Sequence, residues 1–452
     1  EAGGLLAVFP AGEVAHLDLR KLAVTDPEWY ELVARIALRA NASTLPVYFK
    51  GANGPVFHML GLLHPRMRTI LLPHEFLNKR HRRIELRIGS PVAAKRLKPL
   101  PDDAARTAYL RRRTFLLADR EERPARRASR SGEPIAPAVP AERLSHEIDR
   151  LPEESRLLSC GDFDVLLAPA ALIPNVLAEI GRLRETTFRE AGEGTGKAAD
   201  LDRFDEHYLH LWIWNRRSGE IAGAYRLGAT DVLRRRFGLK GLYTSTLFAF
   251  KDEFVDRIDP ALELGRSFVR LEYQREFAPL LLLWKGIGAY VCRHPRYRVL
   301  FGPVSISNAY RPASRELMVT FLERSSSCPE LRPLVRARTP FRRRRFGSLA
   351  GNGEELGGDI DELSSLVGEI EAGAKGVPVL LRQYLKMGGK LLAFNVDARF
   401  SHALDGLIVV DLRQTDPKML ERYMGKEHAA RFLASVRAGS APPAGGVSQP
   451  DR

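Results

Sequence analysis

The feature that most constrains the fold is the alternation of short apolar strands with amphipathic helices between residues 161 and 323. Apolar side chains repeat every second residue in some segments and at a helical spacing in the segments between them. Strands are predicted at 164–168, 208–215, 220–227, 262–269 and 298–305, and helices at 173–189, 229–237, 279–292 and 312–323. This order predicts an α/β domain built on a central sheet.

One of these strands carries charge where a half-buried strand favours apolar side chains. Glu263, Gly265 and Arg266 interrupt the apolar pattern of 262–269. Gly inside a strand often marks a bulge, which turns backbone donors and side chains towards a ligand. In isolation the stretch is better interpreted as an edge strand with a surface ion pair between Glu263 and Arg266. The neighbouring sequence blocks favour a functional strand.

The charge of the chain predicts an acidic partner. Its 452 residues suffice for two or three domains, and the formal net charge is +15. The basic residues lie in scattered blocks, so we expect an anionic membrane surface or an acidic carrier protein and no nucleic acid. Three cysteines without ligand spacing argue against a structural metal and favour a reducing compartment. No apolar run reaches the roughly 18 residues that a membrane span needs.

Composition also divides the chain into segments. The predicted segments are a first domain at 1–120, a basic Pro- and Ala-rich linker at 121–155, an α/β domain at 156–436 with a flexible insertion at 324–372, and a disordered tail at 437–452. The further predicted elements are a buried strand at 5–9, helices at 28–40 and 378–387, and strands at 45–49, 390–396 and 406–412. The last two strands would complete the sheet of the α/β domain.

The first domain resembles the glycerolipid acyltransferases. Phe9-Pro-Ala-Gly-Glu-Val-Ala-His16 is similar to their Phe-Pro-Glu-Gly block, and Leu45-Pro-Val-Tyr-Phe49 to a later block. The matched positions are Phe9, Pro10, Gly12 and Glu13, with Ala11 at the acidic position. The family's His-x-x-x-x-Asp block, whose His acts as general base, is absent. Residues 1–120 are therefore predicted to be inactive in O-acyl transfer. Because the chain opens on Glu1, we expect an upstream part of the natural protein.

The second domain resembles the acyl-homoserine-lactone synthases in four ordered blocks. These blocks are Arg182-Leu-Arg-Glu-Thr-Thr-Phe188, Asp200-Leu-Asp-Arg-Phe-Asp205, Ala222-Gly-Ala-Tyr-Arg226 and Glu263-Leu-Gly-Arg266. With Gly302-Pro-Val-Ser-Ile-Ser-Asn308 and Leu380-Leu-Arg-Gln-Tyr384, they are similar to the hemolysin-like N-acyltransferases of amino-acid lipid synthesis, including the ornithine-lipid enzymes. Some of these enzymes carry a fused glycerolipid-type acyltransferase domain. The resemblance implies the N-acetyltransferase (GNAT) fold, a mixed sheet whose central strand splays from its neighbour and admits a thioester donor.

The resemblance also implies roles for residues of these blocks. Glu263 is the candidate general base for the amine proton, with a plain ion pair to Arg266 as the alternative. Backbone N–H groups from Gly265 to Ser267 would polarise the thioester carbonyl. The acceptor carboxylate is expected to meet Arg184, Arg226 and Arg266. The acidic run would pair with these arginines or with the amine of the acceptor, through Asp200, Asp202 and Asp205. An exposed loop with helix-capping Asp explains that run equally.

The remaining candidates concern the donor. Phe188, Trp212 and Phe268 are interpreted as core residues that overlap with an acyl tunnel. Ser305, Ser307 and Asn308 can reach a pantetheine arm, although a strand-end turn explains them equally. The loop 272–279 has no glycine, whereas coenzyme A-dependent relatives cradle the pyrophosphate there. We therefore expect an acyl carrier protein thioester as donor rather than acyl-coenzyme A, and no bound cofactor or metal.

Together these features predict an N-acyltransferase. It would move a fatty acyl chain from acyl carrier protein to the α-amine of an amino acid and give a lyso-aminolipid. A 3-hydroxylated chain, ornithine as acceptor, and a cytoplasmic protein bound at the inner face of the cytoplasmic membrane follow from the resemblance alone. The alternatives are an acyl-homoserine-lactone-like signal synthase and a non-catalytic membrane-binding or cytolytic protein.

Overall fold

The chain folds into two compact units that interleave along the sequence. The computed structural model describes residues 3–19, 23–120, 132–275, 278–343, 359–373 and 375–438. The first unit comprises 1–124, 311–321 and 343–377, and the second comprises 125–310, 322–342 and 378–452. Each unit therefore contains segments from both halves of the chain.

The first unit consists of short strands and helices around a small core. Its elements are β1 (His16–Asp18), β2 (Ala23–Thr25), α1 (Leu32–Arg39), β3 (Val47–Lys50), α2 (Pro55–Leu63), α3 (Pro65–Asn78), β4 (Glu85–Ile88), α4 (Ala94–Leu97), α5 (Asp103–Leu116) and α12 (Ile360–Ile370). β1 pairs with β2 and β3 with β4, both antiparallel. Ala37, Val92, Leu97 and Leu110 form the buried cluster between α1, α4 and α5.

Two sequence predictions in this unit are wrong. Residues 5–9 form no strand, and Leu5 and Phe9 are 95% and 76% exposed, because β1 pairs with β2 instead. The predicted flexible insertion 324–372 is wrong for its last part, which forms the helix α12 and buries Leu363 and Val367, whereas its residues 344–358 lie outside the described residues. Asp359 caps this helix by accepting a hydrogen bond from the Asp361 N–H. The acidic, Gly-rich surroundings hid its helical spacing of apolar residues.

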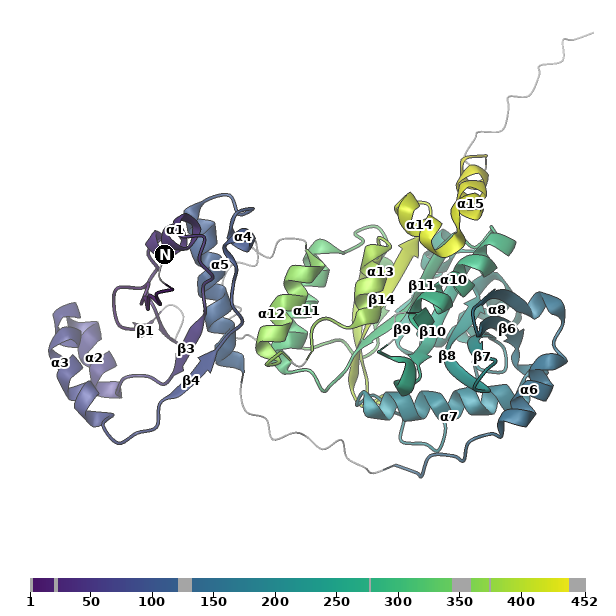
Figure 1. Ribbon diagram of the computed structural model, residues 1–452, viewed down its shortest axis with the longest axis horizontal. Helices are drawn as coiled ribbons and strands as arrows, with labels where there is room; N and C mark the ends of the chain where they lie inside the picture. Colours follow the sequence, from purple (N-terminus) through teal and green to yellow (C-terminus); the bar gives the residue numbers. More distant parts are fainter. Residues whose placement is uncertain are drawn as a thin grey trace, which may run out of the picture. The chain divides into compact units, whose positions relative to one another are not determined.

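The second unit is built on an eight-stranded mixed sheet (Figure 1). Its strands are, in spatial order, β13 (Lys390–Asp397), β14 (Ala403–Asp411), β11 (Val299–Ile306), β10 (Ala261–Val269), β8 (Glu220–Ala229), β7 (Leu209–Asn215), β6 (Phe163–Pro169) and β5 (Arg156–Cys160). Only β10 and β11 pair in parallel among these described strands. The strands predicted after residue 160 are confirmed to within a few residues.

Helices cover both faces of this sheet (Figure 1). The helices of the unit are α6 (Ala141–Asp149), α7 (Pro174–Glu190), α8 (Thr230–Phe237), α9 (Asp252–Ile258), α10 (Ala278–Arg293), α13 (Val379–Lys386), α14 (Pro417–Met424) and α15 (Lys426–Ala438). α11 (Pro312–Ser325) is shared between the units, and β9 (Phe248–Phe250) pairs with β12 (Val335–Ala337). The core beneath α6 and α7 includes Trp212, whereas α10 packs on Leu211, the next residue, so the two helical layers lie on opposite faces.

The predicted linker is wrong for its second half. Residues 141–149 form α6, whose Leu144 and Ile148 lie in the core with α7. Pro140 occupies the N-cap position, where the missing N–H costs nothing, and the prolines of this segment lie before or after the helix and do not break it. Residues 121–131 and the predicted tail from 439 lie outside the described residues. Within the described part of the chain, every helix is too short or too polar to cross a bilayer.

Candidate functional site

The centre of the sheet opens between β10 and β11. These strands pair in parallel only from Ala261 to Glu263, opposite Val299 to Phe301. At the next position a Cβ on Gly302 would lie 2.0 Å from the Leu264 carbonyl oxygen, so only glycine permits this close approach of the backbones. Beyond it the strands diverge. The splayed central strand that the resemblance implied is therefore present.

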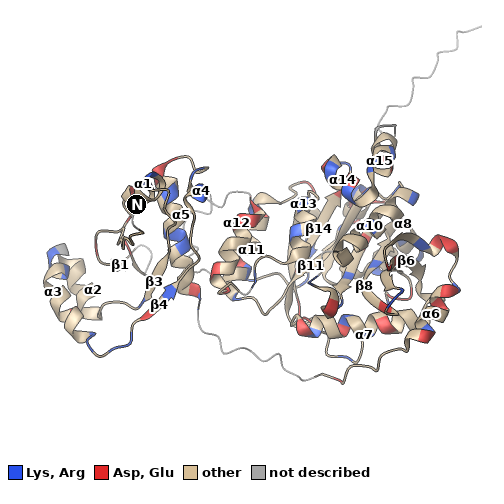
Figure 2. Ribbon diagram, in the orientation of Figure 1, with Lys and Arg blue, Asp and Glu red and all other residues tan. Residues whose placement is uncertain are grey.

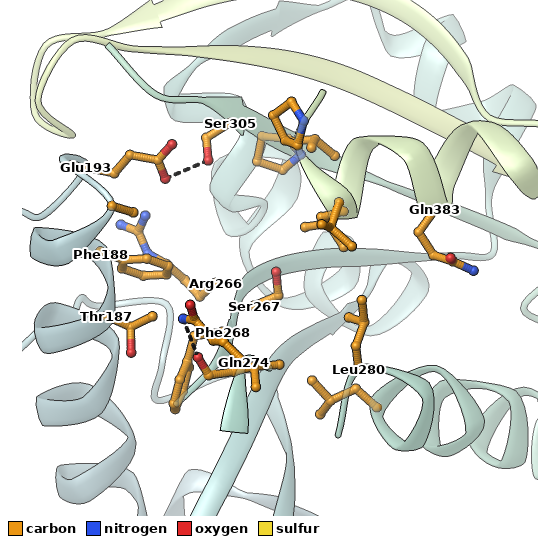
Figure 3. Close-up of a pocket in the computed structure, with 18 of the residues that line it drawn as sticks. Thr187, Phe188, Glu193, Arg266, Ser267, Phe268, Gln274, Leu280, Ser305 and Gln383 are labelled. Carbon is orange, nitrogen blue, oxygen red and sulfur yellow. Dashed lines mark hydrogen bonds between the residues drawn. The ribbon is translucent and has the colours of Figure 1, made fainter. Parts of the chain in front are cut away.

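A cavity of about 740 Å³ occupies this opening. Figure 3 shows Phe188 of α7 on one side, Phe268 of β10 below, and Leu280 of α10 with Gln383 of α13 on the other side. The further apolar lining residues are Val269, Leu271, Leu281, Leu283, Trp284, Val304, Val379 and Leu380. The polar lining residues include Glu193, Arg266, Ser305, Asp397 and Asp405. The cavity thus combines a long apolar wall with an acidic end.

β10 carries a bulge at the edge of this cavity. Its register with β8 shifts between Gly265 and Phe268, so that Arg266 and Ser267 together face Tyr225. The bulge was predicted, but its unusual backbone lies one residue later, since Arg266 and not Gly265 has a positive φ, of 50°. The Arg266 guanidinium lies 4.8 Å from the centre of the Tyr243 ring and 5.0 Å from that of Phe400. These contacts hold the strained residue in place.

The acidic run and the predicted arginines form one buried ionic network. Arg184 contacts Asp205 at 2.8 Å, and Arg226 contacts Asp202 at 2.7 Å and Asp205 at 3.2 Å. Burial alone would raise the pKa of Asp205, but the two guanidinium charges outweigh it and hold that pKa well below its usual range. The predicted pairing is therefore present, and the alternative of an exposed loop is wrong for Asp200 and Asp205, which are buried, while Asp202 is partly exposed.

Of the three predicted arginines, only Arg266 is among the described residues that line the cavity. Arg184 and Arg226 are 0% and 1% exposed, pair with the acidic run and do not line the cavity, so their role as acceptor ligands stays a prediction. Arg266 lines the cavity and contacts Asp200 at 3.2 Å. The network consequently ties the loop around residues 200–205 to β8 and β10 and fixes Arg266 beside the cavity.

Glu263 is fully buried and is not among the residues that line the cavity, although Tyr243, which contacts it, is one of them. It accepts hydrogen bonds from the Tyr208 hydroxyl, from the Thr244 N–H at 2.6 Å and from the Tyr243 N–H at 3.2 Å. Burial raises the pKa of its carboxyl group. These contacts indicate that the carboxyl group anchors loop 243–244 to the sheet, while Arg266 pairs with Asp200. The role of Glu263 as general base stays a prediction.

Three carboxyl groups that sequence reasoning missed lie at the acidic end of the cavity. Glu193, Asp397 and Asp405 line it, and the Ser305 hydroxyl donates a hydrogen bond to Glu193 at 2.8 Å (Figure 3). Burial, together with the charges of Asp397 and Glu193, raises the pKa of Asp405 well above its usual range, and Arg266 opposes this shift. A charge inside the apolar strand Ala403–Asp411 was a signal of the kind that singled out Glu263.

The other predicted residues divide between cavity and core. Phe188, Phe268 and Ser305 line the cavity as predicted. Ser307 donates to the Ala191 carbonyl oxygen at 2.7 Å, and Asn308 follows it outside the cavity lining, which agrees with the strand-end turn. Trp212 is fully buried in the core beneath α7. Phe9, Pro10, Gly12 and Glu13 lie in the first unit, where Gly12 donates its N–H to the Phe9 carbonyl oxygen in a turn.

The donor prediction rests partly on residues that the structure does not describe. Glu276 and Phe277 of the loop 272–279 lie outside the described residues. Across the described ranges, no group of three or more His, Cys, Asp or Glu side chains is arranged to hold a metal ion.

Comparison with known proteins assigns the core of this site to a family. Residues 183–285, which include β7, β8, β10 and the second half of α7, match the family described as Acetyltransferase (GNAT) domain. The chain contains a GNAT domain. This match includes Glu193, Arg266 and Phe268 of the cavity but not Asp397 and Asp405 of its acidic end.

Two curated relatives support the same assignment. The chain is 43% identical over 162 residues to a glycine N(alpha)-acyltransferase of Bacteroides thetaiotaomicron, covering 33% of this chain and 48% of that protein. It is 40% identical over 162 residues to a glycine N(alpha)-acyltransferase of Phocaeicola vulgatus, covering 33% of this chain and 50% of that protein. The chain thus spans about half the length of these relatives. No solved structure gave a significant match. The glycerolipid acyltransferase resemblance of residues 1–120 stays a prediction.

Proposed function

We propose that the second unit is an N-acyltransferase that moves a fatty acyl chain from a thioester donor to the α-amine of an amino acid. The observation that carries this proposal is the cavity between β10 and β11, which has an apolar wall and an acidic end. The wall offers a surface for the acyl chain, and the acidic end offers a place for an ammonium group. The GNAT match and the named activity of the relatives support the same reaction.

Asp405 is our candidate general base. The acceptor amine must lose a proton before its nitrogen attacks the thioester carbon, and a carboxylate with a raised pKa accepts a proton near neutral pH. Glu193 and Asp397 would orient the ammonium group before that transfer. As the new C–N bond forms, the attacking nitrogen gives up a second proton and the C–S bond breaks. The departing thiolate takes up this second proton, and Asp405 releases the first one to solvent.

The bulge of β10 supplies the means to polarise the thioester carbonyl. Arg266 and Ser267 together face one residue of β8, so the bulge leaves backbone groups without a ladder partner there. An N–H group turned into the opening would stabilise negative charge on the carbonyl oxygen during attack. Arg266 would bind the carboxylate of the amino acid, since its guanidinium group lines the cavity near the acidic end.

For the donor we propose acyl carrier protein. The net charge of +15 suits an acidic carrier protein, and the loop 272–279 lacks the glycines that favour a pyrophosphate. For the acceptor, the relatives' names suggest glycine, whereas the resemblance to amino-acid lipid enzymes suggests ornithine. Both carry the α-amine and carboxylate that the proposed site requires.

The test is acyl transfer by the purified chain from acyl carrier protein or acyl-coenzyme A to glycine or ornithine, followed by mass spectrometry. We expect an N-acyl amino acid, and Asp405→Asn should lower kcat by about 10²–10⁴-fold. The matched control is Asp411→Asn at the end of the same strand, where the carboxylate pairs with Arg413, and it should keep full activity.

Each other outcome refutes a part of the proposal. Full activity of Asp405→Asn would remove the base assignment. A diffusible lactone as product would favour a signal synthase. Absence of transfer with every donor and acceptor would favour the non-catalytic alternative.

A further inference from the structure

The helices α2 and α3 of the first unit pack side by side and expose an unusually apolar surface (Figure 1). His64 separates them and caps α3, its Nδ1 accepting a hydrogen bond from the Arg66 N–H at 3.1 Å. The exposed apolar side chains of the pair are Val56, Met59, Leu62, Leu63, Ile70, Phe76 and Leu77. Leu63 and Phe76 are 79% and 81% exposed. Scattered apolar residues on a surface are ordinary, but seven on two adjoining helices indicate a binding face.

Basic residues accompany this face. Residues 55–84 contain six Lys or Arg residues, and Lys79-Arg-His-Arg-Arg83 directly follows α3 (Figure 2). The acidic residue of this stretch, Glu75, is buried, where it accepts a hydrogen bond from the Gly54 N–H at 3.0 Å and contacts Lys79 at 3.6 Å. The exposed surface of the pair is therefore apolar and cationic, without an exposed carboxylate among its described residues.

We propose that α2, α3 and the basic arm 79–83 bind the surface of an anionic lipid bilayer. Exposed apolar side chains on helices beside a cluster of Lys and Arg are the combination that favours the headgroup region of such a membrane. The apolar side chains would enter the boundary between headgroups and acyl chains, while the arm contacts lipid phosphates. A second copy of the chain is a poorer occupant, because it would place one basic arm against another.

The proposal concerns a surface of the first unit and is independent of the acyl-transfer reaction. Its test is sedimentation of the full chain with phosphatidylcholine vesicles, with and without phosphatidylglycerol, at low and high salt. We expect binding only to the anionic vesicles, weakened by salt. Phe76→Ser combined with Arg82→Glu should weaken this binding about tenfold or more.

The matched control carries the same changes on α8 of the second unit. Phe237→Ser combined with Arg235→Glu alters one exposed aromatic and one exposed basic residue of a basic helix and should leave binding unchanged. Circular dichroism checks that both variants fold. If the Phe76→Ser, Arg82→Glu variant unfolds, Phe76→Trp provides a second measurement. The fluorescence of Phe76→Trp should shift to the blue with anionic vesicles, and that of Phe237→Trp should not.

Three results would overturn the proposal. The first is equal binding to vesicles of both compositions or to neither. The second is an equal loss of binding in the Phe76→Ser, Arg82→Glu variant and in the α8 control. The third is a dimer that forms without lipid in analytical ultracentrifugation and is abolished by the Phe76→Ser, Arg82→Glu variant but not by the α8 control. This result would assign the face to a second copy of the chain.

Discussion

Replacement of Glu263 tests whether its carboxyl group anchors the fold or acts in catalysis. In Glu263→Gln the remaining side-chain oxygen can keep the Thr244 N–H, while the new NH₂ replaces the oxygen that faces Tyr208 and Tyr243. The Tyr208 hydroxyl can then donate to the Gly241 carbonyl oxygen, at 3.2 Å, and accept from the Tyr243 N–H, at 2.8 Å. All three donors keep a partner, so we expect a loss of only about 1 kcal/mol in the free energy of unfolding.

Glu263→Ala should cost more. It leaves the Thr244 N–H without its carboxylate partner, at about 1–3 kcal/mol, and opens a cavity that adds about 1–2 kcal/mol. We therefore expect a total loss of about 2–5 kcal/mol. Urea unfolding followed by tryptophan fluorescence measures both values, and acyl transfer is measured well below the unfolding midpoint.

The kinetic result decides the role of the residue. An anchoring Glu263 predicts that the Gln variant keeps kcat within about tenfold of the parent protein. A Gln variant of unchanged stability that loses about 10²-fold or more in kcat would refute this reasoning and restore Glu263 as general base.

Two further perturbations test the sheet and its buried network. Burial, aided by Arg184, lowers the pKa of His210 to about 4, so the unfolded chain takes up a proton first as the pH falls. Stability should therefore drop by about 3 kcal/mol between about pH 6.5 and pH 4 in urea unfolding, and His210→Asn should lack this drop. Gly302→Ala should cost about 1–3 kcal/mol or more, because its Cβ meets the Leu264 carbonyl oxygen. Gly265→Ala, whose Cβ meets nothing within 4 Å, should be nearly neutral, and equal losses would contradict the close approach at Gly302.

The order of strands and helices after residue 160 was predictable because each element has a clear period and a clear end. The hairpin at Asn215–Gly219 is an example, since Gly219 has the positive φ of 66° that its turn requires. Residues 5–9 show the limit of such reasoning, because an apolar run forms a strand only where a neighbour offers backbone partners.

The sequence predicted many residues of the site but not which of them line the cavity. Glu263, Arg266 and the acidic run stood out because charges interrupt apolar elements, and they do form buried interactions. Which of these side chains line the cavity depends on the bulge and on loop 243–244, which a single sequence does not reveal. Asp405 went unnoticed because its partners, Glu193 and Asp397, come from separate segments of the chain.

The interleaving of the two units limits how this protein can be divided. Glu369, on α12, forms a buried ion pair of 2.6 Å with Arg113 of α5, although more than half of the chain separates them in sequence. A fragment ending at residue 120 would lose this ion pair together with the contacts that α12 makes with α5. A fragment limited to the second unit meets a related difficulty. Residues 343–377 belong to the first unit, but the chain has to pass through them to reach Val379 and Asp405, which complete the cavity. A single genetic crossover therefore cannot exchange one whole unit without also exchanging part of the other.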